Sequence, residues 1–127
     1  MCENRFYICP HCGNIVGMIH SSGAPLVCCG EPMKALEANT TEAATEKHIP
    51  VVTVEGNIVK AAVGEVTHPM TDAHHIAWVY VETDKGGHRK CLDHTAEPVL
   101  TFALTDDEKP VAVYAYCNLH GLWAVKL

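Results

Sequence analysis

A cysteine and a histidine, Cys117 and His120, stand three positions apart near the end of the chain, and both side chains are common metal ligands. Three more histidines, His48, His68 and His74, fall where predicted strands begin or connect. We interpret the five donors as one metal site. A structural zinc site normally closes at four ligands. Five donors therefore favour a redox-active iron with one open octahedral position, and a thiolate opposite that position would push electron density toward whatever binds there.

Two charged residues directly precede His48. Lys47 is the natural source of positive charge over the open position, and Glu46 could reach the same place, although a solvated charge pair is the alternative for both. His74 has a competitor in His75, because adjacent side chains of a strand point to opposite faces. The remaining histidines are predicted to be ordinary surface or turn residues: His11, His20, His75, His88 and His94.

A second group of donors lies near the start of the chain. Cys9 and Cys12 have the spacing of a metal chelate, and Cys28 and Cys29 follow sixteen positions beyond Cys12. Together they predict a four-thiolate site, and the adjacent pair requires the backbone to bend. Zinc and iron both suit four thiolates. The alternative is a redox pair at Cys9 and Cys12 with two buried thiols, but such a pair needs a following helix that the sequence does not offer.

Composition limits the classes of function. The chain has 127 residues, 48% of them hydrophobic, and a formal net charge of −6, which argues against nucleic acid and anionic membranes as partners. No apolar run approaches the roughly 20 residues of a membrane span, and the first residues lack the apolar segment of a signal peptide. We therefore expect a cytoplasmic protein. Its seven cysteines then favour metal binding over disulfides.

Two cysteines have no partner at ligand spacing. Cys91 is predicted to be a small buried residue, and Cys2 an exposed thiol near the terminus. Met70 and Trp78 are expected in the core.

The positions of turn formers divide the chain. Residues 1–36 hold four cysteines and short apolar runs at Phe6–Ile8 and Pro25–Val27, which predict brief strands in a module too small for a sufficient hydrophobic core. A bound metal would supply the missing stability. Residues 37–47 are polar and predict a linker with room for one helical turn.

Residues 48–127 have a β pattern, with short segments rich in valine, isoleucine, threonine and aromatic residues. Seven strands at this spacing predict an all-β fold, an immunoglobulin-like sandwich whose loops bring the five donors to one end. The predicted strands are Ile49–Glu55, Asn57–Val63, His75–Glu82, Gly87–Leu92, Pro98–Leu104, Pro110–Tyr116 and Leu122–Leu127.

Five motifs in order make the chain resemble the desulfoferrodoxins, the two-iron class of superoxide reductase. They are Cys9-Pro-His-Cys12, Leu26-Val-Cys-Cys-Gly-Glu-Pro-Met33, Glu46-Lys-His-Ile-Pro50, His68-Pro-Met70 with His74, and Cys117-Asn-Leu-His120. The resemblance covers nearly the whole chain. It implies a desulforedoxin-like N-terminal domain followed by an immunoglobulin-like sandwich, and a homodimer.

The resemblance also implies two irons per chain. One, Fe(3+), is held by Cys9, Cys12, Cys28 and Cys29. The other, Fe(2+)/Fe(3+), has four equatorial imidazoles and an axial thiolate: His48, His68, His74, His120 and Cys117. In this family the lysine that maps to Lys47 attracts superoxide and aids protonation of the product, and the glutamate that maps to Glu46 can ligate oxidised iron.

The implied reaction is one-electron reduction of superoxide to hydrogen peroxide without dioxygen, followed by re-reduction by an external donor such as rubredoxin. The sequence leaves open whether the four-cysteine iron takes part in turnover. Two rival functions remain: an electron carrier whose second centre is closed, and a zinc-ribbon interaction protein that uses only the cysteines.

Overall fold

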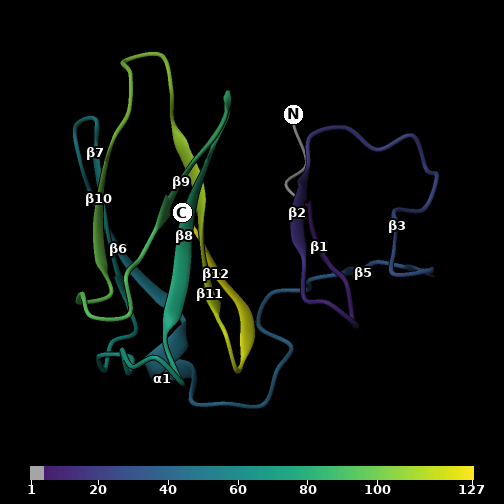
Figure 1. The fold of residues 1–127 in the computed structure, drawn as a ribbon. Coiled ribbons are helices and arrows are strands. Elements are labelled where there is room, and N and C mark those ends of the chain that lie inside the picture. The colour runs from purple at the N-terminus through teal and green to yellow at the C-terminus, as the bar shows by residue number, and fades with distance from the viewer. Residues whose placement is uncertain (1–4) are drawn as a thin grey trace. The chain divides into compact units, whose positions relative to one another are not determined.

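The computed structural model describes residues 5–127, and the chain divides into two units with the boundary between Glu37 and Ala38 (Figure 1). Cys2, predicted to be exposed, lies outside the described residues. Within residues 5–127 no helix has the length and apolar character needed to cross a membrane.

The N-terminal unit consists of short strands joined by turns. Three of them form an antiparallel sheet in the order β2-β1-β5, and two more form a separate antiparallel pair. The strands are β1 (Arg5–Ile8), β2 (Ile15–Met18), β3 (Val27–Cys28), β4 (Glu31–Pro32) and β5 (Lys34–Ala35). Among the described residues of this unit whose burial is known, only Phe6 and Cys9 are buried. Apolar packing alone is therefore scant, as expected for a module that depends on a metal.

The C-terminal unit is a sandwich of two antiparallel sheets, as predicted. One sheet has the order β10-β7-β6 and the other β12-β11-β8-β9. The elements are α1 (Thr45–His48), β6 (Pro50–Glu55), β7 (Ile58–Val63), β8 (Ile76–Thr83), β9 (Gly86–Cys91), β10 (Val99–Ala103), β11 (Pro110–Cys117) and β12 (Gly121–Lys126). Each of the seven strands begins and ends within one residue of its predicted bounds.

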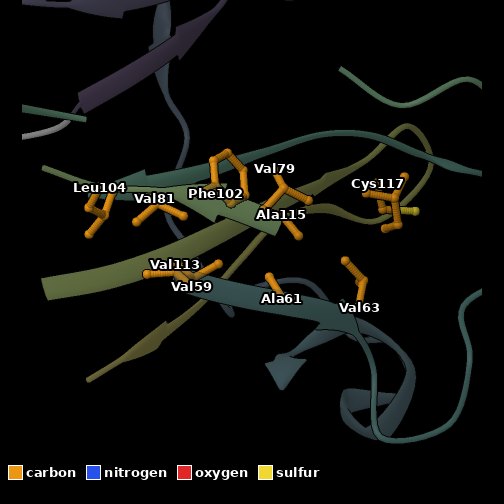
Figure 2. Close-up of a cluster of buried hydrophobic side chains, with 11 residues drawn as sticks. Val59, Ala61, Val63, Val79, Val81, Phe102, Leu104, Val113, Ala115 and Cys117 are labelled. Carbon is orange, nitrogen blue, oxygen red and sulfur yellow. The ribbon is translucent and has the colours of Figure 1, made fainter. Parts of the chain in front are cut away.

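The inward-facing residues of both sheets form one core. Val59 and Ala61 of β7 face Val81 of β8 and Val113 of β11, and all four side chains are fully buried. Figure 2 shows Leu104 at one end of this cluster and Cys117 at the other. The predicted thiolate ligand is thus the last residue of the hydrophobic core, which fixes its position through packing.

One prediction about burial needs correction. Cys91 is exposed, because it ends β9, an edge strand that pairs only with β8 and is largely open to solvent. Trp78 is among the buried hydrophobic residues, as predicted, and stacks on Tyr116 with ring centroids 5.5 Å apart. Met70 packs against the core, as predicted.

Candidate metal centres

The structure brings the five predicted donors of the C-terminal unit together. His48 ends α1, His68 and His74 lie in the connection between β7 and β8, Cys117 ends β11, and His120 lies in the turn before β12. Their ligand atoms all lie within 4.8 Å of one another. Figure 1 shows α1 and the turn between β11 and β12 at the same end of the sandwich.

The four imidazoles form a closed cycle. His48 contacts His68, His68 contacts His74, His74 contacts His120, and His120 contacts His48, with ring centroids 4.6 to 5.0 Å apart and the rings nearly perpendicular. The opposite pair His48 and His74 is farther apart, at 6.4 Å. Such a cycle surrounds a single point, and the thiol of Cys117 lies 3.9 Å from Nδ1 of His120.

Hydrogen bonds to backbone carbonyls fix which nitrogen of two rings carries the proton. Nδ1 of His48 donates to the Ala44 carbonyl at 2.7 Å, and Nδ1 of His68 donates to the Pro69 carbonyl at 2.7 Å. A carbonyl can only accept, so Nε2 of each neutral ring carries a lone pair. These two Nε2 atoms face each other at 3.0 Å. Two lone pairs at that distance repel unless a cation lies between them.

A further nitrogen of the cycle also requires a partner. Nε2 of His74 is buried and has no hydrogen-bond partner among the described residues, a situation that is costly for a polar atom. Nδ1 of His120 faces Nε2 of His48 at 3.0 Å. Four imidazoles and one sulfur therefore converge, with at least two of the nitrogens carrying lone pairs that face each other, and this donor set fits a bound iron.

The electrostatics of the rings favour the metal-binding form. Burial lowers the pKa of His68 to about 4, and it is also the first cause of the lowered pKa of His48 and of His74. Neutral imidazole is the form that binds a metal. The positive charge of Lys47 contributes to the lowered pKa of both His48 and His74, so this side chain lies near both rings.

Lys47 is half-buried and Glu46 is exposed, both beside the donor cycle on α1. Glu46 does not belong to the five-donor group and lines a surface pocket with Ile49, Val51 and Glu65.

The connection after β7 holds α1 in place. The Val66 amide donates to the Glu46 carbonyl at 2.8 Å, and Gly64, with φ +88°, lies directly against the Lys47 carbonyl. A Cβ at Gly64 would approach that oxygen to 2.6 Å. Only glycine fits here, so the end of β7 sets the position of the peptide that leads into His48.

Trp123 supports two ligands at once. Its ring stacks on His48 with centroids 4.7 Å apart, and its Nε1 donates to the His120 carbonyl at 3.1 Å. Sequence reasoning missed Trp123 and Gly64, because both act through contacts between residues distant in the chain. The only local signal was a glycine at the end of a predicted strand.

The four cysteines of the N-terminal unit also come together, with their sulfurs within 4.8 Å of one another. Cys29 has φ 53°, which is the backbone bend that two adjacent cysteines require to reach one metal. Cys12 is followed by a turn and β2 rather than a helix, and neither Cys28 nor Cys29 is buried. The structure therefore supports a four-thiolate site over a separate redox pair.

The thiols of this site differ in acidity. The Cys12 amide donates to Sγ of Cys9 at 3.5 Å, and this hydrogen bond is the main reason that the pKa of Cys9 falls to about 6. Neighbouring thiols, Cys12 first, raise the pKa of Cys29 to about 12. Sγ of Cys28 accepts a hydrogen bond from Nδ2 of Asn14 at 3.8 Å, a contact that the sequence did not predict.

The histidines predicted to be ordinary lie outside both donor groups. His11 is exposed and pairs with Glu31 at 3.1 Å, and His88 pairs with Glu108 at 3.0 Å. Nδ1 of His75 donates to the Thr71 carbonyl at 2.9 Å, so His74 rather than His75 joins the cycle.

Comparison with known proteins agrees with both centres. Residues 40–126 match the desulfoferrodoxin family, and residues 2–36 match the family described as the desulfoferrodoxin N-terminal domain. A desulfoferrodoxin homolog of Archaeoglobus fulgidus is 48% identical over 94% of this chain and 94% of its own. The desulfoferrodoxin of Nitratidesulfovibrio vulgaris is 44% identical over 95% of this chain and 94% of its own.

Solved structures give the same result. The superoxide reductase from Treponema pallidum is 44% identical, with a TM-score of 0.82 over 98% of this chain and 99% of that one. The one-iron superoxide reductase from Giardia intestinalis is 34% identical, with a TM-score of 0.54 over 65% of this chain and 99% of that one. With both family matches and relatives of this identity along nearly its full length, the chain belongs to the desulfoferrodoxin family.

Proposed function

We propose that the chain is a superoxide reductase, an enzyme that converts superoxide into hydrogen peroxide without producing dioxygen. The observation that carries the proposal is the donor cycle of the C-terminal unit. His48 and His68 face each other with lone pairs at 3.0 Å, His74 has a buried nitrogen without a partner, and the thiol of Cys117 completes the set. The similarity to the superoxide reductase from Treponema pallidum supports the same function.

The ligand set is proposed as His48, His68, His74, His120 and Cys117 at the second centre, and Cys9, Cys12, Cys28 and Cys29 at the first. Iron held by the second set would supply the one electron that reduces superoxide. The overall change is balanced: superoxide gains one electron and two protons and becomes hydrogen peroxide. Burial lowers the pKa of His48, His68 and His74 and so favours their neutral, metal-binding form. The fifth donor, Cys117, lies at the end of an apolar core, where a charge is little screened.

Lys47 is proposed to attract superoxide and to assist proton delivery to the product. The chain carries a net charge of −6, so an anionic substrate needs local positive charge. The effect of Lys47 on the pKa of His48 and His74 supports a position close to the centre. Glu46 is proposed as a further ligand of oxidised iron. Its exposed side chain lies outside the donor group, so this role requires a change of side-chain conformation.

Several finer assignments also belong to the proposal. The external electron donor is a rubredoxin-like protein, the chain forms a homodimer, and it works in the cytoplasm. Residues 1–36 form the four-cysteine domain, 37–47 the linker and site loop, and 48–127 the superoxide reductase domain. The family match to residues 2–36 supports the end of the first domain, and the match to residues 40–126 begins within the proposed linker.

Two measurements test the function. Freshly purified protein should contain about two irons per chain, one for each donor set; one zinc and no iron would refute the enzyme. A pulse of superoxide delivered to the reduced protein should oxidise the second centre and yield one hydrogen peroxide per superoxide, with no dioxygen. A closed electron-transfer centre would instead react slowly and would leave superoxide to dismutate, which releases dioxygen.

A further inference from the structure

The side chain of Asn118 joins the two loops that carry the ligands His74, Cys117 and His120. Oδ1 of Asn118 accepts a hydrogen bond from the His75 amide at 2.8 Å, and its Nδ2 donates to the Ala73 carbonyl at 2.9 Å. These two backbone groups lie on either side of His74. The Asn118 amide also donates to the His75 carbonyl, at 3.2 Å. Asn118, in the Cys117–His120 turn, is therefore hydrogen bonded to the backbone on both sides of His74, a ligand from another loop.

The position of the His74 ring depends on where its backbone is held. The rings of His48 and His68 are each oriented by a hydrogen bond to a carbonyl. Nε2 of His74 has no hydrogen-bond partner among the described residues. Where no hydrogen bond orients this nitrogen, the direction of the ring is set by where the main chain holds its Cα atom.

Contacts within the loop of His74 shape it but do not anchor it. The His74 amide donates to Oγ1 of Thr71 at 3.0 Å, and the Thr71 amide donates to the His74 carbonyl at 2.9 Å. Both bonds close a turn inside the connection between β7 and β8. They would survive if the whole turn moved away from Cys117. The hydrogen bonds of Asn118, in contrast, cross from one loop to the other.

We propose that Asn118 is a positioning residue that fixes His74 at the correct distance from Cys117 and His120. Its side chain binds main-chain groups and acts through the backbone of a proposed ligand. The inference rests on the proposed iron site of the C-terminal unit and adds the element that sets its geometry. Partners that orient a metal ligand typically change metal affinity or activity by 10-fold to 100-fold when they are removed.

The chain contains a matched control in Asn39. Nδ2 of Asn39 donates to the Ala124 carbonyl at 3.0 Å, and its Oδ1 accepts from the Ala124 amide at 2.9 Å. Asn39→Ala thus removes the same two kinds of hydrogen bond as Asn118→Ala, but from a residue beside no ligand. Asn39 also has φ 62°, a conformation that costs alanine roughly 1 kcal/mol more than asparagine. General destabilisation should therefore be at least as large in the control.

The test uses full-length, iron-loaded protein under anaerobic conditions with a ferrous chelator. We expect Asn118→Ala to lose iron from the second centre roughly tenfold faster than the wild type and to shift the thiolate-to-iron absorption of that centre. Asn39→Ala, whose lost hydrogen bonds go to Ala124 and not to a chain neighbour of a ligand, should lose iron more slowly than Asn118→Ala. The chromophore of the four-cysteine centre serves as an internal reference and should not change in either variant.

A second variant covers the case in which Asn118→Ala fails to fold. Asn118→Asp keeps the acceptor for the His75 amide and replaces the donor to the Ala73 carbonyl by a carboxylate oxygen, which repels that carbonyl. The site is exposed and accepts the added charge, so this variant should fold and still release iron faster than the wild type. Equal iron loss in Asn118→Ala and Asn39→Ala would overturn the proposal, as would wild-type behaviour of Asn118→Asp. If the wild type itself holds no second iron, the proposed function fails instead, so the two failures are distinguishable.

Discussion

A methyl group at Gly64 should damage the second metal centre without entering it. The Cβ of an alanine there would overlap the Val66 carbonyl and lie 2.6 Å from the Lys47 carbonyl. An ordinary contact begins at 3.4 Å, so the Lys47 carbonyl would have to retreat by about 0.8 Å. The peptide that must move joins Lys47 to His48. The displacement therefore reaches the proposed steering charge and a proposed ligand together.

The expected effect on the reaction is large. A misplacement of about 1 Å can reduce an enzymatic rate by about 100-fold, and part of the strain in Gly64→Ala will be relieved elsewhere. We expect the second-order rate with superoxide to fall by at least about tenfold. The positive φ of Gly64 adds about 1 to 2 kcal/mol of conformational cost for alanine.

Gly56 provides the control that separates these two effects. It also has a positive φ, +58°, but a Cβ at Gly56 would meet no atom within 4 Å. Gly56→Ala therefore has the same kind of conformational cost as Gly64→Ala but no steric clash. The assay is a superoxide pulse followed by absorption at the second centre, with thermal unfolding of both variants measured alongside. If the two variants react with superoxide at the same rate, the argument that Gly64 positions the Lys47 to His48 peptide is wrong.

Three further predictions concern single side chains. Lys47→Ala should react more slowly with superoxide and lose part of its salt dependence, since a steering charge is gone; Lys60→Ala, at an exposed site on β7, should show neither change. Cys117→Ser should abolish the thiolate-to-iron absorption of the second centre, whereas the four-cysteine chromophore survives; loss of both would contradict independent centres. Glu108, hydrogen bonded first of all by His88, has its pKa lowered from 4.5 to about 2. The stabilising effect of the Glu108 carboxylate is complete above about pH 4.5 and is lost as the pH falls toward 2. Glu108→Gln should therefore lose less thermal stability than the wild type between about pH 5 and about pH 3. An equal loss in both proteins would refute the assignment.

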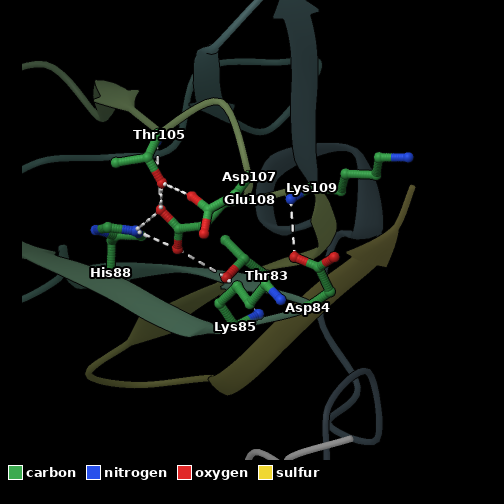
Figure 3. Close-up of polar contacts among 8 residues, drawn as sticks. All are labelled: Thr83, Asp84, Lys85, His88, Thr105, Asp107, Glu108 and Lys109. Carbon is green, nitrogen blue, oxygen red and sulfur yellow. Dashed lines mark hydrogen bonds and ion pairs between the residues drawn. The ribbon is translucent and has the colours of Figure 1, made fainter.

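The groups around Glu108 explain why that carboxylate is singled out. Oε1 of Glu108 accepts hydrogen bonds from Oγ1 of Thr83 at 3.0 Å and from Nε2 of His88 at 3.0 Å, and Figure 3 shows the carboxylate between these side chains and Thr105. Figure 1 shows the connection between β10 and β11 at the end of the sandwich opposite α1. The pH effect of Glu108 should therefore appear in stability and not in the spectrum of the second centre.

The strands of the C-terminal unit could be predicted because their signals are local. Turn formers such as Gly56 and Asn57 bound each segment, and alternation of side chains identifies the inner face. The burial of single residues was harder to predict. Cysteine is a residue type that is usually buried, but Cys91 is exposed because β9 is an edge strand. Strand order is a property of the whole sheet, and no window of sequence contains it.

The donor residues could be predicted for a related reason. Few side chains bind iron, so histidine and cysteine mark a centre by their type, wherever the fold places them. The residues that set its geometry have no such mark. Gly64 acts by lacking a side chain, Asn118 by binding main-chain groups, and Trp123 by stacking on His48 and binding a carbonyl. Glycine, asparagine and tryptophan have many other structural roles in proteins, so their residue type alone does not mark a metal centre.

The ligand residues alone do not show that a related chain can form the second centre. A sequence that kept the five donors but carried alanine at the position of Gly64 would retain every recognisable motif of the second centre. Its Lys47 carbonyl would nevertheless have to move away from the new methyl group, and His48 would move with it. Conversely, a substitution at Asn118 would leave all proposed ligands present and remove the two side-chain hydrogen bonds that join the loop of His74 to the residue after Cys117. The proposed ligand set is therefore not sufficient by itself, and we expect the contacts at Gly64 and Asn118 to determine whether the five donors can reach one iron.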